Sequence, residues 1–429
     1  MQVMKWSVIA LAVAAGTTQL AFASSQSESK GFVEDAKFNI FNRALYHNRD
    51  YRNGASNSNS KAGVTNGYFE EFGLGIRLLA ESGFTQGTVG VGVDAHSLSS
   101  IKLDSGRGRT RGFDQFGLND EGRPEDTQSE VGGAIKFRIS DTVLKYGNQM
   151  TGSPVFSTDD SRILPEVATG TLLTSNEIEG LELTAGRFTA ISSQYQSARD
   201  DLRLNEINIV GAGYSFTDNF YGAIHASDAE DHFKKTYVNL NYNLPLADSQ
   251  ALNFDFNGYR TNGQGKELSG EVDNTIWSLA AAYSMGAHKL TLAHQRSKGD
   301  SGYSYGNIDG GGTIWLSNSV QVSDFNNEDE TSWQVRYDLN MAEYGVPGLS
   351  FMTRYITGED ITLRNGAGVI TSTGEKEHEW DIEGKYVIQE GAAKDLSFRV
   401  RNAILRANSG VIRDTNDFRI IVEYPLSVL

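Results

Sequence analysis

Two arginines in the segment LSFRVRNAIL (396–405), Arg399 and Arg401, alternate with the apolar residues Phe398 and Val400. On a β-strand, side chains two positions apart point the same way and lie about 6.6 Å apart. A guanidinium binds a carboxylate through two parallel hydrogen bonds and stays charged at physiological pH. If this segment is a strand, the pair predicts two successive anion contacts on one face of a sheet.

Motifs that would indicate an enzyme or a metal site are weak. The chain has no cysteine, and its 7 histidines form no H-E-x-x-H motif. GYSYG (302–306) matches G-x-S-x-G, but it lies in an insertion rich in Gly, Asp and Ser, without the strand–turn–helix context that a nucleophile at Ser304 needs. DFNNEDE (324–330) could bind calcium through its oxygens, but a solvated acidic loop is the simpler interpretation. We therefore predict no catalytic residue, no metal and no cofactor.

The first residues predict export. Lys5 precedes the short apolar run WSVIALAVAAG, and the small-residue stretch AFA precedes Ser24, as in a secretory signal peptide. We expect residues 1–23 to be the signal peptide and residues 24–429 to be one mature domain. No later stretch approaches the roughly 18 apolar residues of a membrane helix. The formal net charge of −16 argues against nucleic acid as a partner.

Apolar and polar residues alternate with a period of two through the mature chain, as in the segments EFGLGIRLLA (71–80), GAIKFRIS (133–140), SWQVRYDL (332–339) and DFRIIVEYPL (417–426). Short turns alternate with long polar insertions near 47–67, 97–129, 150–170, 188–204, 227–235, 260–273, 297–330, 357–377 and 406–416. Long loops at one end and short turns at the other are typical of an outer-membrane barrel. The predicted fold is all-β, an 18-stranded antiparallel transmembrane β-barrel.

The barrel assigns a solvent to each face. Closure of the barrel leaves no unpaired backbone edge in the hydrocarbon of the membrane. A barrel of 18 strands is wide enough to enclose an aqueous channel. The apolar face therefore meets lipid, and the charged face lines the lumen. By parity the inward arginines are Arg43, Arg138, Arg336, Arg354, Arg399, Arg401 and Arg419. Because the first and last strands become neighbours, Arg43 and Arg419 should join Arg399 and Arg401 in one basic row. The alternative for any one arginine is an ion pair with a nearby carboxylate, from Glu379, Asp381, Glu383 or Glu423.

Long segments of the chain resemble the OprD family of pseudomonad outer-membrane porins, also called the Occ family. They include GFVEDAKFNIFNRALYHNRDYRNG (31–54), PVFSTDDSRILPE (154–166), YGVPGLSFMTRYITGED (344–360) and IEGKYVIQEGAAKDLSFRVRN (382–402), and they follow one another in order over nearly the whole mature chain. The resemblance implies a mostly monomeric barrel in the outer membrane, in contact with its lipid and lipopolysaccharide, with a weak trimer as the alternative. It also implies that the third long loop folds inward as a constriction.

The resemblance further implies passive uptake of small carboxylate-bearing solutes along a row of basic side chains. Asp159, Asp160 and Arg162, in the third loop, are our candidates for a rim opposite that row, and Arg187 and Arg296 occupy family-like positions with ambiguous facing. One branch of the family prefers cyclic or aromatic organic acids, which we favour here, and another prefers basic amino acids and related peptides. A barrel that acts mainly as a structural or adhesive surface protein, and a barrel enzyme that uses Ser304, are the remaining alternatives.

Overall fold

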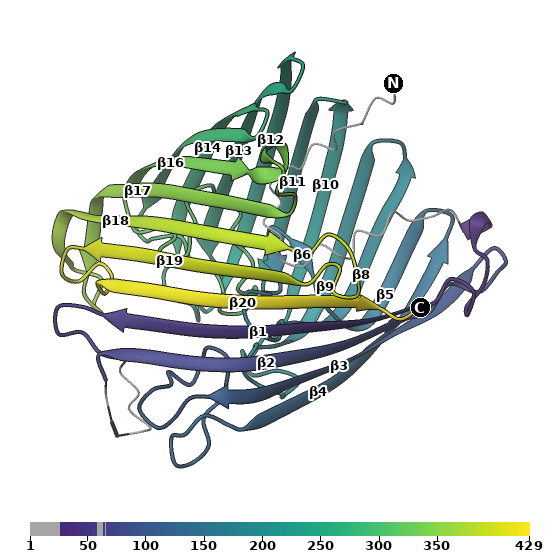
Figure 1. Ribbon diagram of the computed structural model, residues 1–429, viewed down its shortest axis with the longest axis horizontal. Coiled ribbons are helices and arrows are strands. Elements are labelled where there is room, and N and C mark those ends of the chain that lie inside the picture. The colour runs from purple at the N-terminus through teal and green to yellow at the C-terminus, as the bar shows by residue number, and fades with distance from the viewer. Residues whose placement is uncertain (1–25, 58–62, 65) are drawn as a thin grey trace.

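The computed structural model describes residues 26–57, 63–64 and 66–429, and in this part of the chain 18 strands form one antiparallel sheet closed on itself (Figure 1). β1 (Lys37–Tyr51) pairs with β2 (Tyr68–Glu81) on one side and with β20 (Thr415–Ser427) on the other, which closes the barrel. The predicted fold is confirmed. The expected signal peptide, residues 1–23, lies outside the described residues.

The remaining strands follow in chain order. The first of them are β3 (Gly90–Asp104), β4 (Thr127–Ile139), β5 (Thr142–Gln149), β8 (Val167–Ile178), β9 (Leu181–Ser192), β10 (Ile207–Thr217), β11 (Phe220–Ala229) and β12 (Phe233–Ala247). They are followed by β13 (Gln250–Gly263), β14 (Asp273–Met285), β15 (His288–Gly299), β16 (Thr331–Asn340), β17 (Leu349–Arg364), β18 (Ile370–Val387) and β19 (Ser397–Ala407). Outside the barrel sheet lie a small hairpin of β6 (Gly152–Ser153) and β7 (Phe156–Ser157), and the 3-10 helices η1 (Gln26–Glu28) and η2 (Met341–Tyr344). No helix among the described residues is long and apolar enough to cross a membrane.

Long loops and short turns lie at opposite ends of the barrel, as predicted. Three of the long loops contribute to the lumen: L2 (105–126), L3 (150–166) and L7 (300–330). Two predicted insertions are shorter than expected: only residues 230–232 separate β11 from β12, and residues 365–369 separate β17 from β18. The β11–β12 and β17–β18 hairpins continue beyond the lipid-facing part of the barrel. Strand pairing needs no apolar side chains there, so polar residues that look like a loop in the sequence remain part of the strands.

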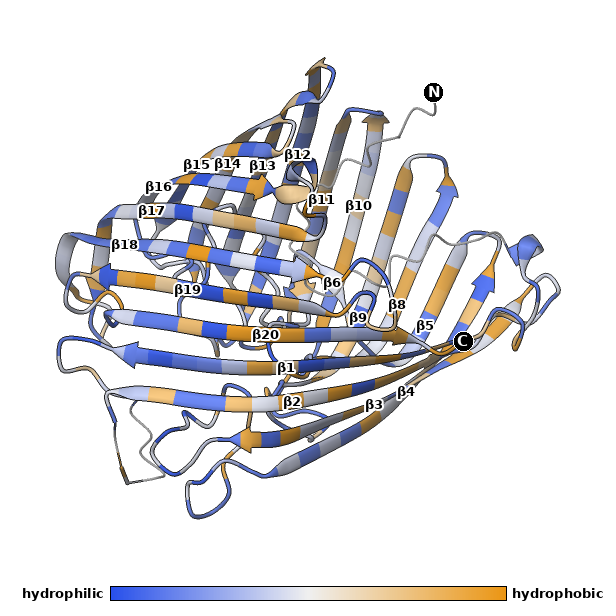
Figure 2. Ribbon diagram, viewed as in Figure 1, coloured by the Kyte–Doolittle hydropathy of each residue, from blue (hydrophilic) through white to orange (hydrophobic). Residues whose placement is uncertain are grey.

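The strands present alternating side chains to the two faces, which Figure 2 shows as alternating hydrophilic and hydrophobic bands. On β19, Phe398 and Val400 point outward and are 43% and 45% exposed. Arg399 and Arg401 point into the lumen, where their side chains are 27% and 19% exposed. The outer face is therefore the lipid-facing one.

L3 packs inside the barrel against the seam between β1, β2 and β20. Its residue Ile163 is fully buried in a cluster with Leu45 of β1 and Ile421 of β20. Gly75 of β2 permits this contact, since a Cβ at this position would lie 2.1 Å from the carbonyl oxygen of Ile163. The inward fold of L3 is confirmed.

L7 also folds into the barrel, which the sequence did not predict. Its residues Tyr303, Ile308 and Leu316 share a buried cluster with Phe156 of L3 and Tyr259 of β13. The lumen is thus narrowed by L3 on the β1–β2 wall and by L7, which packs on β13 and also reaches β20, where its Gln321 donates to Asp417.

Candidate functional site

The basic wall of the lumen is centred on Arg399 and Arg401. Both contact one carboxylate, Glu383 of β18, with Nε–Oε separations of 3.5 Å and 3.0 Å. Lys385, two residues further along β18, lies directly across from Arg399 in the strand register. Two guanidiniums that share one carboxylate leave a formal excess of positive charge in the lumen.

Neighbouring strands extend this wall. In the register, Arg401 lies opposite Arg419 of β20, and Arg336 of β16 lies opposite Arg354 of β17. Arginines with inward parity therefore lie on β16, β17, β19 and β20, and their role as a row for a substrate stays a prediction. These arginines have carboxylate partners. Arg354 pairs with Asp381 (2.7 Å), which the alternative interpretation named, whereas Arg419 pairs with Asp417 (2.7 Å) and Arg336 with both oxygens of Asp338 (2.8 and 2.7 Å), two carboxylates that it did not name.

Arg43 holds the constriction loop instead of facing open lumen. Its guanidinium donates to the Asp160 carboxylate (2.9 Å) and to the backbone oxygens of Asp160 and Arg162 (2.7 and 2.5 Å). Arg77 of β2 adds an ion pair with Asp160 at 2.6 Å. The expectation that Asp160 forms a rim opposite the arginines is wrong, because this carboxylate docks L3 onto the basic wall itself.

Arg162 is also turned toward the wall side, where its Nε donates to Asp114 of L2 at 2.8 Å. Asp159 remains as an acidic group of the L3 rim, where its carboxylate accepts from the Ser161 amide and hydroxyl.

Two further carboxyl groups join Asp159 where L3 meets L7. Glu166 accepts from the Asp159 and Gly311 amides, at 2.8 and 2.9 Å. Burial, and then repulsion from Asp159, raises the pKa of Glu166 to about 8. The pKa of Asp324 of L7 is raised by burial, with a smaller contribution from Asp159. The two inward loops therefore bring three carboxyl groups together, and Glu166 is largely uncharged at neutral pH.

Arg138 faces inward as predicted but lies at the turn end, away from the basic row. Its Nε donates to Gln26 at 2.8 Å, and its guanidinium lies 4.2 Å from the Phe84 ring centroid. It is 4% exposed, because the segment after Gln26 covers it.

Arg187 and Arg296 do not line the lumen, and their expected pore-lining position is wrong. Arg187 is 63% exposed on the outer face of β9, where it pairs with Glu206 at 2.5 Å. Arg296 alternates with Gln295 and Ser297 of β15, which are fully buried on the inner face, so its side chain is directed outward.

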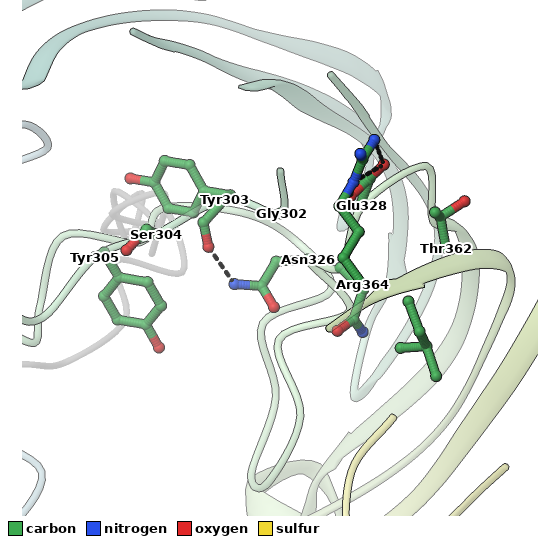
Figure 3. A pocket seen from close by; sticks show the side chains of 10 residues that line it. Gly302, Tyr303, Ser304, Tyr305, Asn326, Glu328, Thr362 and Arg364 are labelled. Atoms are coloured by element: carbon green, nitrogen blue, oxygen red, sulfur yellow. Dashed lines mark hydrogen bonds and ion pairs between the residues drawn. The ribbon is translucent and has the colours of Figure 1, made fainter. Parts of the chain in front are cut away.

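Ser304 lies in a shallow pocket of about 400 Å³ on L7, between Tyr303 and Tyr305 (Figure 3). None of the described residues that line this pocket is a histidine or an aspartate. Across the described residues, no group of three His, Cys, Asp or Glu side chains could hold a metal ion.

Three basic side chains on the inner wall were not predicted from the sequence. Lys385 has the same parity as Glu383, and Arg77 has the same parity as the inward residues of β2, so both could have been added to the basic row. The third, Lys235 of β12, forms a fully buried pair with Asp309 of L7 at 2.6 Å. No sequence signal joins these two residues, because the contact depends on the inward fold of L7.

A closed barrel with an apolar outer face, a charged lumen and loops folded inward is the architecture of an outer-membrane channel. A family model described as "outer membrane porin, OprD family" matches residues 30–428. The chain belongs to the OprD family of outer-membrane porins, and its place is the outer membrane.

Known relatives match 92% to 100% of this chain. Porin D of Pseudomonas aeruginosa is 46% identical over 100% of both chains. OccAB1 of Acinetobacter baumannii matches with a TM-score of 0.87 and 33% identity, over 95% of this chain and 100% of that one. OpdK of Pseudomonas aeruginosa, crystallised with vanillate, matches with a TM-score of 0.82 and 32% identity, over 92% of this chain and 100% of that one. These relatives are channel proteins.

Proposed function

We propose that this porin is a passive, substrate-selective channel for small carboxylate-bearing solutes, with cyclic or aromatic organic acids favoured. The observation that carries the proposal is the pair Arg399 and Arg401, whose two guanidiniums share the single carboxylate of Glu383. The remaining positive charge is available to a passing anion. Its position on the lumen wall, near the docked L3, exposes it to solutes that cross the constriction.

Passage follows from the spacing and the screening of these charges. Arg399 and Arg401, called the central rungs below, lie two residues apart on one strand, which is a distance of about 6.6 Å. A carboxylate that leaves one guanidinium is therefore already close to the next. Screening limits each contact to about 8 Å at physiological ionic strength, so the rungs act only where L3 and L7 hold the solute near the wall. Several moderate contacts in series allow entry without trapping, and a concentration gradient supplies the drive.

One relative bears on the identity of the solute. OpdK was crystallised with vanillate, an aromatic carboxylate, which supports the favoured class. The second candidate class is basic amino acids and related peptides, whose cationic groups the Asp159 carboxylate on the L3 rim would attract. A solute with both an ammonium and a carboxylate group could contact both sides of the lumen.

Swelling of liposomes that contain the purified porin tests the proposal with matched solutes. Benzoate and its neutral isostere benzamide differ in charge but little in size, so we expect benzoate to enter faster through the native porin. The advantage should disappear in the R399Q/R401Q variant and persist in R187Q, which removes an arginine from the outer face. Equal rates for the two solutes in the native porin would refute the proposal. Entry of arginine faster than benzoate would replace the favoured class with the second candidate.

A further inference from the structure

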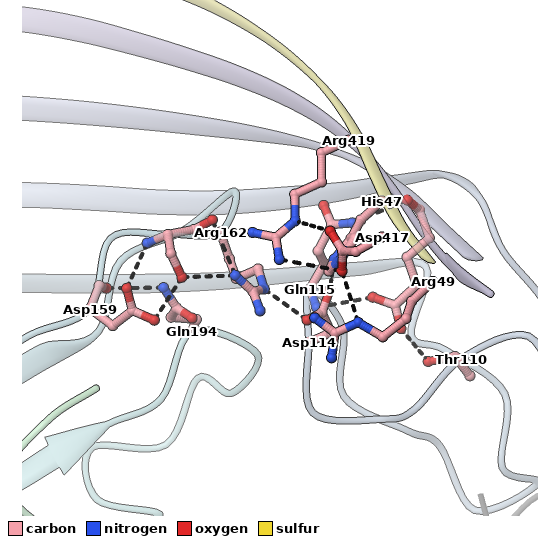
Figure 4. A network of polar contacts seen from close by, with 12 residues as sticks. His47, Arg49, Thr110, Asp114, Gln115, Asp159, Arg162, Gln194, Asp417 and Arg419 are labelled. Carbon is pink, nitrogen blue, oxygen red and sulfur yellow. Dashed lines mark hydrogen bonds and ion pairs between the residues drawn. The ribbon is translucent and has the colours of Figure 1, made fainter. Parts of the chain in front are cut away.

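His47 lies on the inner face of β1, fully buried, with a carboxylate on each side of its ring (Figure 4). Its Nδ1 is 2.9 Å from Oδ2 of Asp114, and its Nε2 is 2.8 Å from Oδ2 of Asp417. Asp114 belongs to L2 and Asp417 to β20, so one imidazole joins a loop to the seam where the barrel closes.

The hydrogen-bond donors and acceptors around His47 require an imidazole ring that carries a positive charge. An ionised carboxylate only accepts hydrogen bonds, and a neutral imidazole has a single N–H. Asp417 also accepts from Arg49 Nε (2.8 Å), Arg419 Nε (2.7 Å) and Gln321 Nε2 (2.9 Å), so it is ionised and the His47 Nε2 must donate to it.

Asp114 is ionised as well. Burial raises the pKa of its carboxyl group, but the Arg162 guanidinium, whose Nε donates to it at 2.8 Å, is the largest opposing charge, and this pKa lies well below its usual value. The Nδ1 of His47 must therefore also donate, which makes the ring an imidazolium.

The same two carboxylates connect the ring to both inward loops. Oδ1 of Asp114 accepts from Arg162 of L3 at 2.8 Å, and Asp417 accepts from Gln321 of L7 at 2.9 Å. L2, L3 and L7 thus meet at His47, next to Arg419 of the basic wall.

We propose that His47 is a positioning residue for the constriction: through Asp114 its imidazolium holds L2, and through Arg162 also L3, against the β1–β20 seam, and loss of one ring proton releases these two loops. In the neutral ring one nitrogen turns its lone pair toward a carboxylate at hydrogen-bond distance, which converts an attraction into a repulsion. The loop carboxylate Asp114 moves away more easily than Asp417, because Asp417 is fixed in a strand.

Other charged groups around the ring come from every element packed on it. They are Arg111 of L2, Arg162 of L3, Arg419 of β20, Arg49 of β1 itself and Glu71 of β2, with the neutral Phe69 ring 4.7 Å away and Gln321 from L7. Burial of the ring, and then the nearby Arg419, favour loss of the ring proton, whereas the two carboxylates in direct contact favour its retention. Glu71 holds L2 separately, through the Thr110 hydroxyl (2.6 Å) and the Gln115 amide (3.0 Å).

Single-channel recording of the full-length mature porin in potassium chloride, from about pH 5 to about pH 10, tests this role. The readout is the fraction of time spent at conductance levels above the main one. Loss of a charge-assisted hydrogen bond raises the ratio of released to docked loops by about tenfold. The fraction of time that the native channel spends above its main conductance level should therefore rise about tenfold as the pH increases.

The decisive variant is Asp114→Asn. The asparagine keeps Oδ1 for Arg162 and offers an N–H donor to the neutral His47 ring, so this channel should stay at its main level over the whole pH range. His47→Gln should show the released levels at every pH. Glu71→Gln, which alters the other buried carboxylate that holds L2, should keep the native pH response.

Folding of each variant is checked by a difference in migration between unheated and heated samples in SDS gels. If H47Q does not fold, the D114N variant alone tests the proposal. A native channel without a pH response over this range, or a D114N channel with the native response, would overturn the proposal. Because only potassium chloride is present, the outcome is independent of which solute the porin carries.

Discussion

Glu383 sets the net charge of the central rungs, and changing it should change anion permeability in a predictable direction. The carboxylate lies 3.5 Å from Arg399 Nε and 3.0 Å from Arg401 Nε, so it offsets one of two positive charges. Glu383→Gln removes that offset with almost no change in size. The double variant R399Q/R401Q leaves only the carboxylate, and the triple variant R399Q/R401Q/E383Q leaves no formal charge.

The expected size of the effect follows from Coulomb's law. A unit charge about 4 Å from a passing anion contributes about 1 kcal/mol in a water-like medium and about 4 kcal/mol where the effective dielectric constant is near 20. A passing anion in the wet lumen keeps most of its water, so we use the lower figure as the minimum effect. A contribution of about 1 kcal/mol is roughly a fivefold change in anion permeability per unit charge.

The reversal potential across a bilayer with a potassium chloride gradient measures this permeability. Anion preference should decrease in the order E383Q, native, triple variant, double variant, with similar steps between neighbours. Raised ionic strength should compress the steps, because screening shortens the range of each charge. A native-like reversal potential in E383Q, or any order that does not follow the charge, would refute the reasoning.

Three further predictions concern the loops. Asp160→Asn removes the carboxylate that Arg43 binds at 2.9 Å, so L3 should loosen and the main conductance level should increase, as read from single-channel steps; an unchanged level would mean that the backbone contacts of L3 suffice. Because burial raises the pKa of Glu166 to about 8, this group gains its charge only as the pH rises through that value, and the cation preference of the native channel should increase there and stay flat in Glu166→Gln. Lys235→Met leaves Asp309 buried without its 2.6 Å partner and should cost about 3–5 kcal/mol, visible as a lower denaturant midpoint, whereas K235M/D309N should recover most of the loss; equal midpoints for the two variants would contradict the buried-pair explanation.

The fold and the central rungs could be predicted from sequence because both depend on the period of two. Closure requires one face of every strand to meet lipid, so alternation fixes the facing of Arg399, Arg401 and Arg354 wherever the outer face is plainly apolar. The same parity would have supplied Lys385.

Facing could not be predicted where the inner wall is itself apolar. On β9, Phe188 points inward and is fully buried against the cluster formed by L3 and L7, so the apolar residues near Arg187 do not mark the lipid side. The register between β8 and β9 also shifts between Thr169 and Gly170, which interrupts the count of alternate residues. Near Arg296, Gln295 and Ser297 are polar yet buried beneath L7, which hides the inner face in the same way.

The inward fold of L7 and the partners of His47 were beyond sequence reasoning for a different reason. These contacts join segments far apart in the chain, such as Asp114 and Asp417, through single polar atoms that impose no spacing on the sequence. Only the closed barrel brings them together.

The central claim is that Arg399 and Arg401 conduct carboxylates, and the most direct test is to record single native channels while benzoate or benzamide is added to one side. We predict brief interruptions of the potassium chloride current by benzoate, none by benzamide, and none by either solute in R399Q/R401Q. Interruptions by benzoate that persist in the double variant, or equal responses to the two solutes in the native channel, would contradict the claim.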